Sequence, residues 1–252
     1  MEVAESTSKN TKSRRRFIKM SGLAIAGSGV LLACSDDDDL PDKPNPPKPG
    51  DVFDLGAGNL GVLNYAYALE QLEAAFYKKV REGGYYSGAN EEEKQIMDDL
   101  YYHESIHKAF FKTAITAAVG EGNEEKVLPE LEFDFSSVDF DDRMTVLTTS
   151  RLLEDTGVSA FNGAGKLIDV DAELGGAYLL IAGKIVSVEA RHASAIADLI
   201  EPNTTAFARD EVLVSIGDSG KAYDKALLPS EVLPAVIDTG FVKTEFTAKE
   251  LQ

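Results

Sequence analysis

The chain contains four long stretches in which apolar residues recur every three or four positions. This spacing is typical of an amphipathic α-helix, because residues three and four apart lie on the same face. The stretches predict helices over about residues 60–81, 90–119, 141–169 and 172–199. Each is long enough to form one helix of a bundle, so the pattern indicates an all-α fold.

Residues that commonly end or begin helices stand at the borders of these stretches. Gly83 and Gly84 follow the first stretch, Gly120 follows the second and Pro202 follows the fourth. Glycine and proline at such places stop a helix. Asn90 is a suitable N-cap for the second stretch, and the three glutamates after it favour a first helical turn. We therefore expect the helix boundaries close to these residues.

Two segments lie outside the four predicted helices. Residues 121–140 lack helical periodicity and contain Pro129, and their length suits a connection that crosses the length of a bundle. Residues 201–252 contain a short helix-like stretch near 229–236 and a β-like run at 240–246. We expect this extension to pack along the bundle or at the contact between two copies, so a homodimer is one expectation for the assembly.

A glutamate lies within the apolar face of each predicted helix. Glu70 belongs to the first helix, Glu104 to the second, Glu154 to the third and Glu189 to the fourth. An isolated ionised carboxylate is costly to bury, so each should meet a cation, a hydrogen-bonding partner or water. One alternative is a bundle without metal whose polar residues pair with one another.

Two of the three histidines in the chain follow a glutamate by three residues. The pairs are Glu104 with His107 and Glu189 with His192, and positions i and i+3 share one face of a helix. A carboxylate and an imidazole placed in this way can both reach one metal ion. Acidic residues occupy 43 of the 252 positions, so this spacing also arises by chance, and the hypothesis depends on the helical context.

The order of these elements resembles the ferritin-like superfamily, in particular the bacterial ferritin-like domain proteins related to the plant desiccation-associated family. The resemblance covers roughly residues 58–200, and its motifs lie in residues 63–77, 103–107, 153–161 and 188–193. It implies a ferritin-like four-helix bundle with a long crossover between helices 2 and 3 and a C-terminal extension. In such a bundle the carboxylates and imidazoles point inward and hold two metal ions.

The resemblance further implies six metal ligands, four carboxylates and two imidazoles. They are Glu70, Glu104, His107, Glu154, Glu189 and His192. The glutamates of the first and third helices would each bind one metal ion, and those of the second and fourth would bridge both ions. Oxygen ligands combined with imidazole suit Fe or Mn better than a metal that prefers thiolates. Two Fe (or Mn) ions are therefore the expected cofactors.

Three further residues lie close to these positions in the sequence. Glu73 is the alternative to Glu70, which is preferred because it stands seven residues before Tyr77, the spacing of the superfamily. Tyr77 is interpreted as a packing residue in preference to an electron donor. His103 lies outside the motif, so we expect it to contact a ligand from outside or to lie on the surface.

The N-terminus predicts export and attachment to a membrane. Residues 13–19 fit the twin-arginine export pattern with Arg14 and Arg15 as its arginine pair, and an apolar stretch too short to span a membrane follows. Residues 31–34 resemble a lipobox, in which Cys34, the single cysteine of the chain, would carry the lipid. The alternatives are a disordered basic tail and an ordinary signal peptide that is cut elsewhere.

An acidic and proline-rich segment follows the predicted lipid site. Four aspartates stand at positions 36–39 and five prolines between positions 41 and 49, a composition typical of an extended tether. The aspartates resemble the signal of some bacterial lipoproteins on the outer face of the outer membrane, and a solvated linker explains them equally well. We expect a lipid-anchored protein of the cell envelope, at its periplasmic face or on the cell surface. The predicted parts are a signal (1–33), a tether (34–57), a bundle (58–200) and an extension (201–252).

Charge excludes one class of partner. The net charge is −18, and removal of residues 1–33 would take away six basic and two acidic residues, which brings it to −22. No basic patch for phosphate contacts would remain, so nucleic acid is not an expected partner. The expected partners are metal ions, O2 or peroxide, and the membrane through the lipid on Cys34.

Two functions are compatible with this reading. The leading one is redox chemistry of a di-iron oxidase or ferroxidase type, in which Fe(II) is oxidised and O2 or peroxide is reduced. The alternative is a non-catalytic, stress-related scaffold or binding protein of the envelope. The first predicts that Glu104→Ala or His192→Ala abolishes turnover, whereas the second predicts that the ligands can be replaced without loss of the protein's role.

Overall fold

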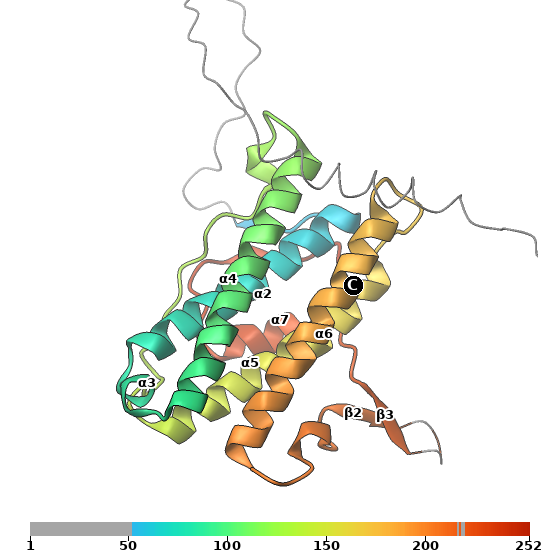
Figure 1. Ribbon diagram of the computed structural model, residues 1–252. Helices are drawn as coiled ribbons and strands as arrows, with labels where there is room; N and C mark the ends of the chain where they lie inside the picture. The colour runs from blue at the N-terminus through green and yellow to red at the C-terminus, as the bar shows by residue number, and fades with distance from the viewer. Residues whose placement is uncertain (1–51, 216, 218–219) are drawn as a thin grey trace, which may run out of the picture. The chain divides into compact units, whose positions relative to one another are not determined.

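The computed structural model describes residues 52–215, 217 and 220–252. The predicted signal with Arg14 and Arg15, the lipid site Cys34 and most of the tether lie outside the described residues. The described residues form four long helices in the predicted order, which confirms the all-α class (Figure 1). They are α2 (Gly58–Glu82), α4 (Glu91–Val119), α5 (Arg143–Ala164) and α6 (Gly175–Ile200).

The four helices form two tightly packed pairs. Helix α2 packs mainly against α4, to which it is joined through the short helix α3 (Gly84–Gly88), and α5 packs mainly against α6. Contacts between the two pairs are fewer, and those between α4 and α6 are few. In Figure 1, α4 and α6 lie in front of the bundle with a visible separation between their ribbons. The interior between the two pairs is where the predicted ligands converge.

The connection between α4 and α5 runs back along α2, as its length predicts. It contains the short 3₁₀-helix η1 (Glu124–Lys126). The side-chain amide of Asn64 donates to the carbonyl of Lys126 at 3.0 Å, and the amide of Tyr85 beyond the end of α2 donates to the carbonyl of Phe140 at 3.0 Å. The connection therefore spans α2, and α5 begins at the same end of the bundle as α4.

Polar residues on the outer face of α2 fix this connection. Asn64 accepts a hydrogen bond from the backbone amide of Leu128 at 3.0 Å. Gln71 accepts from the amide of Leu131 at 2.8 Å and donates to the carbonyl of Pro129 at 3.1 Å. In a helix or strand, backbone N–H and C=O groups pair with one another. Here the side chains of α2 pair with the backbone of the connection instead, so an irregular segment can be buried against a helix. Almost every residue of the middle of α2 is buried as a result.

The C-terminal extension packs along the bundle. It contains η3 (Ala206–Ala208), the antiparallel hairpin of β2 (Leu213–Ser215) and β3 (Lys221–Asp224), α7 (Pro229–Asp238) and β4 (Phe246–Thr247). Strand β4 pairs in parallel with β1 (Phe53–Asp54), with Phe246 opposite Phe53. The predicted short helix is thus present as α7, and the extension ends beside the start of the bundle.

The β-like run at residues 240–246 forms less strand than expected. Val242 makes an isolated antiparallel bridge with Phe133 of the connection, and only Phe246 of the run belongs to a strand. The backbone of Phe241 accepts a hydrogen bond from Asp134 at 2.8 Å. The run meets the connection over a few residues before it reaches β1, so no longer ladder forms.

Most helix ends follow the sequence signals. The side chain of Asn90 accepts a hydrogen bond from the amide of Glu93 at 2.9 Å, as an N-cap does, and Gly120 ends α4 with a φ of 75°. The third helix is shorter than predicted, because α5 stops at Ala164 and continues as the 3₁₀-helix η2 (Gly165–Leu167). The fourth begins later than predicted, after Leu174, whose φ of 65° cannot continue into a preceding helical turn.

The bundle interior has an apolar core on both sides of its polar centre. Tyr67, Phe76 and Tyr77 of α2 are fully buried, as are Ile115 of α4 and Ile196 of α6. These side chains hold the helices at fixed rotations, so the positions between them are pre-set to face inward. Among the described residues, no helix is long and apolar enough to cross a bilayer.

Candidate metal centre

The six predicted ligands lie together in the interior, on four different helices. The four glutamates have no exposed surface, His192 is 6% exposed and the side chain of His107 is 12% exposed. The i, i+3 spacing places each imidazole one turn from the glutamate that precedes it, on the same inward face. The contributions are Glu70 from α2, Glu104 and His107 from α4, Glu154 from α5, and Glu189 and His192 from α6.

The six side chains form two overlapping groups with the geometry of metal sites. In each group, ligand atoms from all members lie within 4.8 Å of one another. Both groups contain Glu104 and Glu189, so these two carboxylates stand between the two positions. The first group adds Glu70 and His107, and the second adds Glu154 and His192. The arrangement can hold two cations with the shared carboxylates between them.

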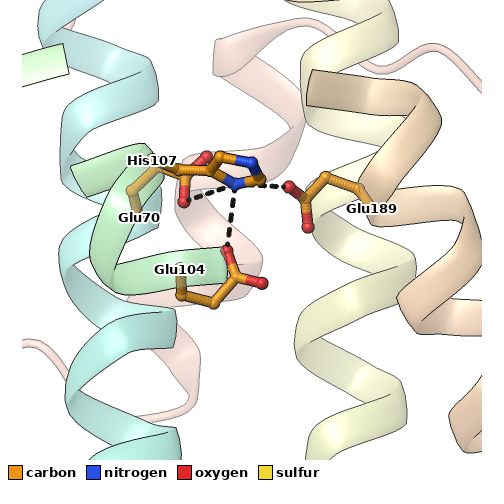
Figure 2. A group of neighbouring side chains, drawn as sticks. All are labelled: Glu70, Glu104, His107 and Glu189. Carbon is orange, nitrogen blue, oxygen red and sulfur yellow. Dashed lines mark ion pairs between the residues drawn. The ribbon is translucent and has the colours of Figure 1, made fainter. Parts of the chain in front are cut away.

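In the first group, one imidazole nitrogen faces three carboxylates. Figure 2 shows Glu70, Glu104 and Glu189 directed at the Nδ1 atom of His107. The distances from Nδ1 to the nearest carboxylate oxygens are 3.4 Å for Glu70, 3.4 Å for Glu104 and 3.0 Å for Glu189. A single N–H cannot serve three acceptors, and this nitrogen makes no hydrogen bond of acceptable geometry. The three carboxylates therefore converge on a nitrogen that cannot satisfy them all.

The second group repeats this pattern around the other imidazole. The Nδ1 atom of His192 lies 2.8 Å from Oε1 of Glu104, 3.4 Å from Oε2 of Glu154 and 3.3 Å from Oε2 of Glu189. In both groups it is thus the Nδ1 atom that faces the carboxylates. Each histidine follows the glutamate of its motif by three residues, so the two groups share this spacing as well.

The buried polar atoms of the centre fit two divalent metal ions. Seven atoms here are buried without a hydrogen-bond partner: both carboxylate oxygens of Glu70 and of Glu104, one oxygen each of Glu154 and Glu189, and Nδ1 of His107. Such a concentration of unpaired buried groups is destabilising unless a cation satisfies them. Four carboxylates carry four negative charges, which two divalent ions would balance. Oxygen donors with imidazole suit Fe and Mn.

Without metal, bound protons neutralise part of the carboxylate charge. Burial raises the pKa of Glu70 well above its ordinary value, and the negative charge of Glu104 adds to the rise. Burial likewise raises the pKa of Glu154 to about 7. Burial alone would raise the pKa of Glu104, but contacts with His107 and His192 outweigh it and lower the pKa to about 2. Against the opposing effect of burial, carboxylate contacts raise the pKa of His107 to about 12.

Without metal, these pKa shifts favour two imidazolium cations and some protonated carboxyls in the centre. The pKa of His192 is raised too: burial alone would lower it, but contacts with Glu104, Glu154 and Glu189 outweigh that effect. Metal binding requires neutral imidazole and ionised carboxylate, so it would release protons from the centre. Metal ions and protons would thus compete for the same buried groups.

Glu73, the alternative to Glu70, is placed beside the centre and outside both groups. It is 2% exposed and lies one turn beyond Glu70 on α2. Its carboxyl approaches α5 at Gly157, where an added Cβ would lie 3.0 Å from Oε1 of Glu73. Gly157 of α5 thus leaves room for the side chain of Glu73. Glu70 is the residue of this helix that joins a metal-like group.

Two contacts of the centre could not be found from sequence spacing. The hydroxyl of Tyr77 donates a hydrogen bond to Glu154, so this residue has a polar contact in addition to its packing role. His103 is exposed, and its Nδ1 lies 2.8 Å from Nε2 of His192, so it contacts a predicted ligand from outside. Both contacts join residues on different helices, which local periodicity does not relate.

The comparison with known families agrees with this geometry. No curated protein matches the chain. A family model described as a ferritin-like domain matches residues 58–202, which is more than half of the chain and includes all four long helices. The matched region ends where the C-terminal extension begins. The chain belongs to the ferritin-like domain family.

Proposed function

We propose that this chain binds a dinuclear iron (or manganese) centre and acts as a redox protein that oxidises Fe(II) and reduces O2 or peroxide. The observation that carries this proposal is the convergence of four buried carboxylates and two imidazoles on two overlapping positions. The ligands would be Glu70, Glu104, His107, Glu154, Glu189 and His192. The alternative role as a non-catalytic scaffold gives no reason for these polar groups to be buried without partners.

The bound ions would supply the electrons, since two Fe(II) ions together yield two electrons, which with two protons convert O2 to hydrogen peroxide or peroxide to water. The protein residues supply binding, charge balance and exclusion of bulk water. Glu104 and Glu189 belong to both positions, so they would keep the two ions close to each other. Carboxylates favour the higher charge of Fe(III), so this donor set lowers the free energy of the oxidised centre.

Side chains of the centre also determine where protons are held. The hydroxyl of Tyr77 holds a proton against Oε1 of Glu154, which leaves Oε2 of Glu154 directed at His192. The Nδ1 atoms of His107 and His192 must lose their protons when metal enters. The centre is therefore built so that its metal-facing atoms become free of protons while the outer hydrogen bonds persist.

The decisive test is the metal content of the full-length chain, purified in detergent and loaded with Fe(II) without oxygen. We expect about two ions per chain by elemental analysis, from the two-ion geometry of such bundles. The double variant Glu104→Ala/His192→Ala should lose the metal and any oxygen uptake while it remains helical by circular dichroism. Glu92→Ala, an exposed acid on the same helix as Glu104, is the matched control and should retain both.

Two results would separate the proposal from its alternative. Metal-free wild-type protein after loading would eliminate the redox function and favour a helical scaffold. Bound metal without oxygen or peroxide consumption would retain the site and contradict the oxidase activity. In the second case the ions would serve stability or recognition.

We further propose that the protein is exported through the twin-arginine route and anchored in the cell envelope by a lipid on Cys34. Residues 13–19 and 31–34 support this proposal. Replacement of Arg14 and Arg15 by Lys should leave the protein inside the cell, and Cys34→Ala should release it from the membrane fraction. Unchanged distribution of both variants after fractionation would contradict export and anchoring, independently of the metal centre.

A further inference from the structure

His103 contacts His192 across the space between α4 and α6. Its Nδ1 atom lies 2.8 Å from Nε2 of His192, and the two rings are nearly parallel, with centroids 5.1 Å apart and an interplanar angle of 10°. His103 is exposed, whereas His192 is 6% exposed. Since α4 and α6 have few other contacts, this pair is a direct link between the two helices that carry the Glu-x-x-His motifs.

The geometry assigns the proton on each ring of this pair when a metal is bound. Nδ1 of His192 faces Glu104, Glu154 and Glu189, so it is the nitrogen that would bind metal. A neutral imidazole with its lone pair at Nδ1 carries its proton at Nε2. That N–H is directed at Nδ1 of His103, which must accept it. The remaining proton of His103 then stands on its own Nε2.

The other imidazole of the centre has no comparable support. No hydrogen bond among the described residues involves the ring of His107, whose Nδ1 lies near three carboxylate oxygens without a hydrogen bond to any of them. The two positions of the centre are therefore unequal, although their ligand types are the same. The outer nitrogen of His192 has a partner on another helix, whereas the ring of His107 has no hydrogen-bond partner among the described residues.

We propose that His103 is a positioning residue that orients His192 for metal binding and makes its metal position the tighter of the two. This inference rests on the proposed dinuclear centre. An acceptor on the outer nitrogen of a metal-binding histidine fixes the ring and increases the basicity of the metal-facing nitrogen. Loss of such an acceptor typically weakens metal binding about 10-fold to 100-fold.

Two substitutions of His103 separate its hydrogen bond from its ring. His103→Phe keeps an aromatic ring beside His192 but offers no acceptor. His103→Gln offers an amide oxygen as acceptor but no ring. Ile106→Ala, which removes an exposed side chain (62%) from the same helix, controls for a general change of this surface.

The experiment is anaerobic titration of the full-length chain in detergent with Co(II), followed by calorimetry and by the Co(II) absorption spectrum. We expect wild-type protein to bind two Co(II) ions with unequal affinity. In His103→Phe the tighter position should weaken about 10-fold to 100-fold with an altered spectrum, while the other position is unchanged. His103→Gln and Ile106→Ala should bind like wild type.

The outcomes distinguish this inference from the proposed function. Two ions bound by His103→Phe with wild-type affinities would overturn the positioning role and leave the dinuclear centre intact. Equal weakening in His103→Gln and His103→Phe would also overturn it, because the acceptor would then not be the cause. Wild-type protein that binds no Co(II) or Fe(II) would remove the centre itself.

Discussion

The hydroxyl of Tyr77 donates a 2.5 Å hydrogen bond to Oε1 of Glu154 in the interior of the bundle. Burial raises the pKa of Tyr77 well above its ordinary value, and the charge of Glu154 adds to the rise, so the hydroxyl remains a donor. The bond joins α2 to α5, two helices that otherwise share few contacts. It also leaves the second oxygen of Glu154 free to face His192.

Loss of this hydroxyl should destabilise the protein. Tyr77→Phe would leave a buried carboxyl oxygen without its partner, and we expect the free energy of unfolding to fall by about 1–3 kcal/mol. Tyr65→Phe is the matched control, because Tyr65 is also buried and its hydroxyl has no hydrogen-bond partner. Denaturant unfolding of the metal-free variants measures both. Equal effects of the two substitutions would show that the hydrogen bond contributes nothing.

The metal-free protein should become less stable as the pH rises from about 4.5 to about 7. Burial raises the pKa of Glu154 to about 7 from an ordinary value of 4.5. A carboxyl whose pKa is higher in the folded state binds its proton more tightly there, so its stabilisation is complete below pH 4.5 and is lost as the pH passes 7. Glu70, whose pKa is raised for the same reason, acts in the same direction.

Thermal unfolding of chelator-treated protein at several pH values measures this dependence. Glu154→Gln should reduce the slope, since the amide does not titrate and can still accept from Tyr77. Iron-loaded protein should show the opposite trend over this range, because metal binding requires ionised carboxylates. A metal-free melting temperature that rises between these pH values would contradict the protonated state inferred for the buried carboxyls.

Glu70 and Glu73 should differ in their effect on metal content. Only Glu70 joins a metal-like group, although both are buried on α2 and burial raises the pKa of both. We expect Glu70→Gln to lose about one of two ions per chain after anaerobic Fe(II) loading. Glu73→Gln should retain both, because Glu73 lies outside both groups. Elemental analysis that showed loss in Glu73→Gln alone would reverse the assignment.

The parts of the fold that sequence could predict are those with a local repeat. The 3.6-residue period predicts that the four helices exist and their order, and the i, i+3 spacing of Glu104 with His107 and of Glu189 with His192 predicts four side chains on inward faces. Glu70 required more than periodicity, because Glu73 lies on nearly the same face of α2. The resemblance to the family favours Glu70 through its spacing to Tyr77, and the structure places Glu70 in the group.

Contacts between distant segments had no such signal. The bond between His103 and His192 joins residues 89 positions apart, and β1 and β4 pair although they stand at opposite ends of the described chain. The burial of α2 on its outer face follows from the connection and the C-terminal extension, whose irregular backbones leave no period in the sequence. Hydrogen bonds with the side chains of Asn64 and Gln71 hold the connection against α2. From the sequence alone, such polar residues predict an exposed helix face, because their partners cannot be foreseen.

The docking of the C-terminal extension on α5 should depend on Gly163. A Cβ atom at this position would overlap the carbonyl oxygen of Leu227, whose amide donates a 2.9 Å hydrogen bond to the carbonyl of Ser159. Gly163→Ala should therefore displace the extension and lower the free energy of unfolding by about 1–3 kcal/mol, although alanine favours a helix. Gly183→Ala on α6 is the matched control, because nothing lies within 4 Å of its added Cβ, and it should raise stability by up to about 1 kcal/mol. Denaturant unfolding and limited proteolysis of residues 201–228 measure both effects. If Gly163→Ala is as stable and as protease-resistant as Gly183→Ala, the close approach of Leu227 to α5 does not hold the extension on the bundle.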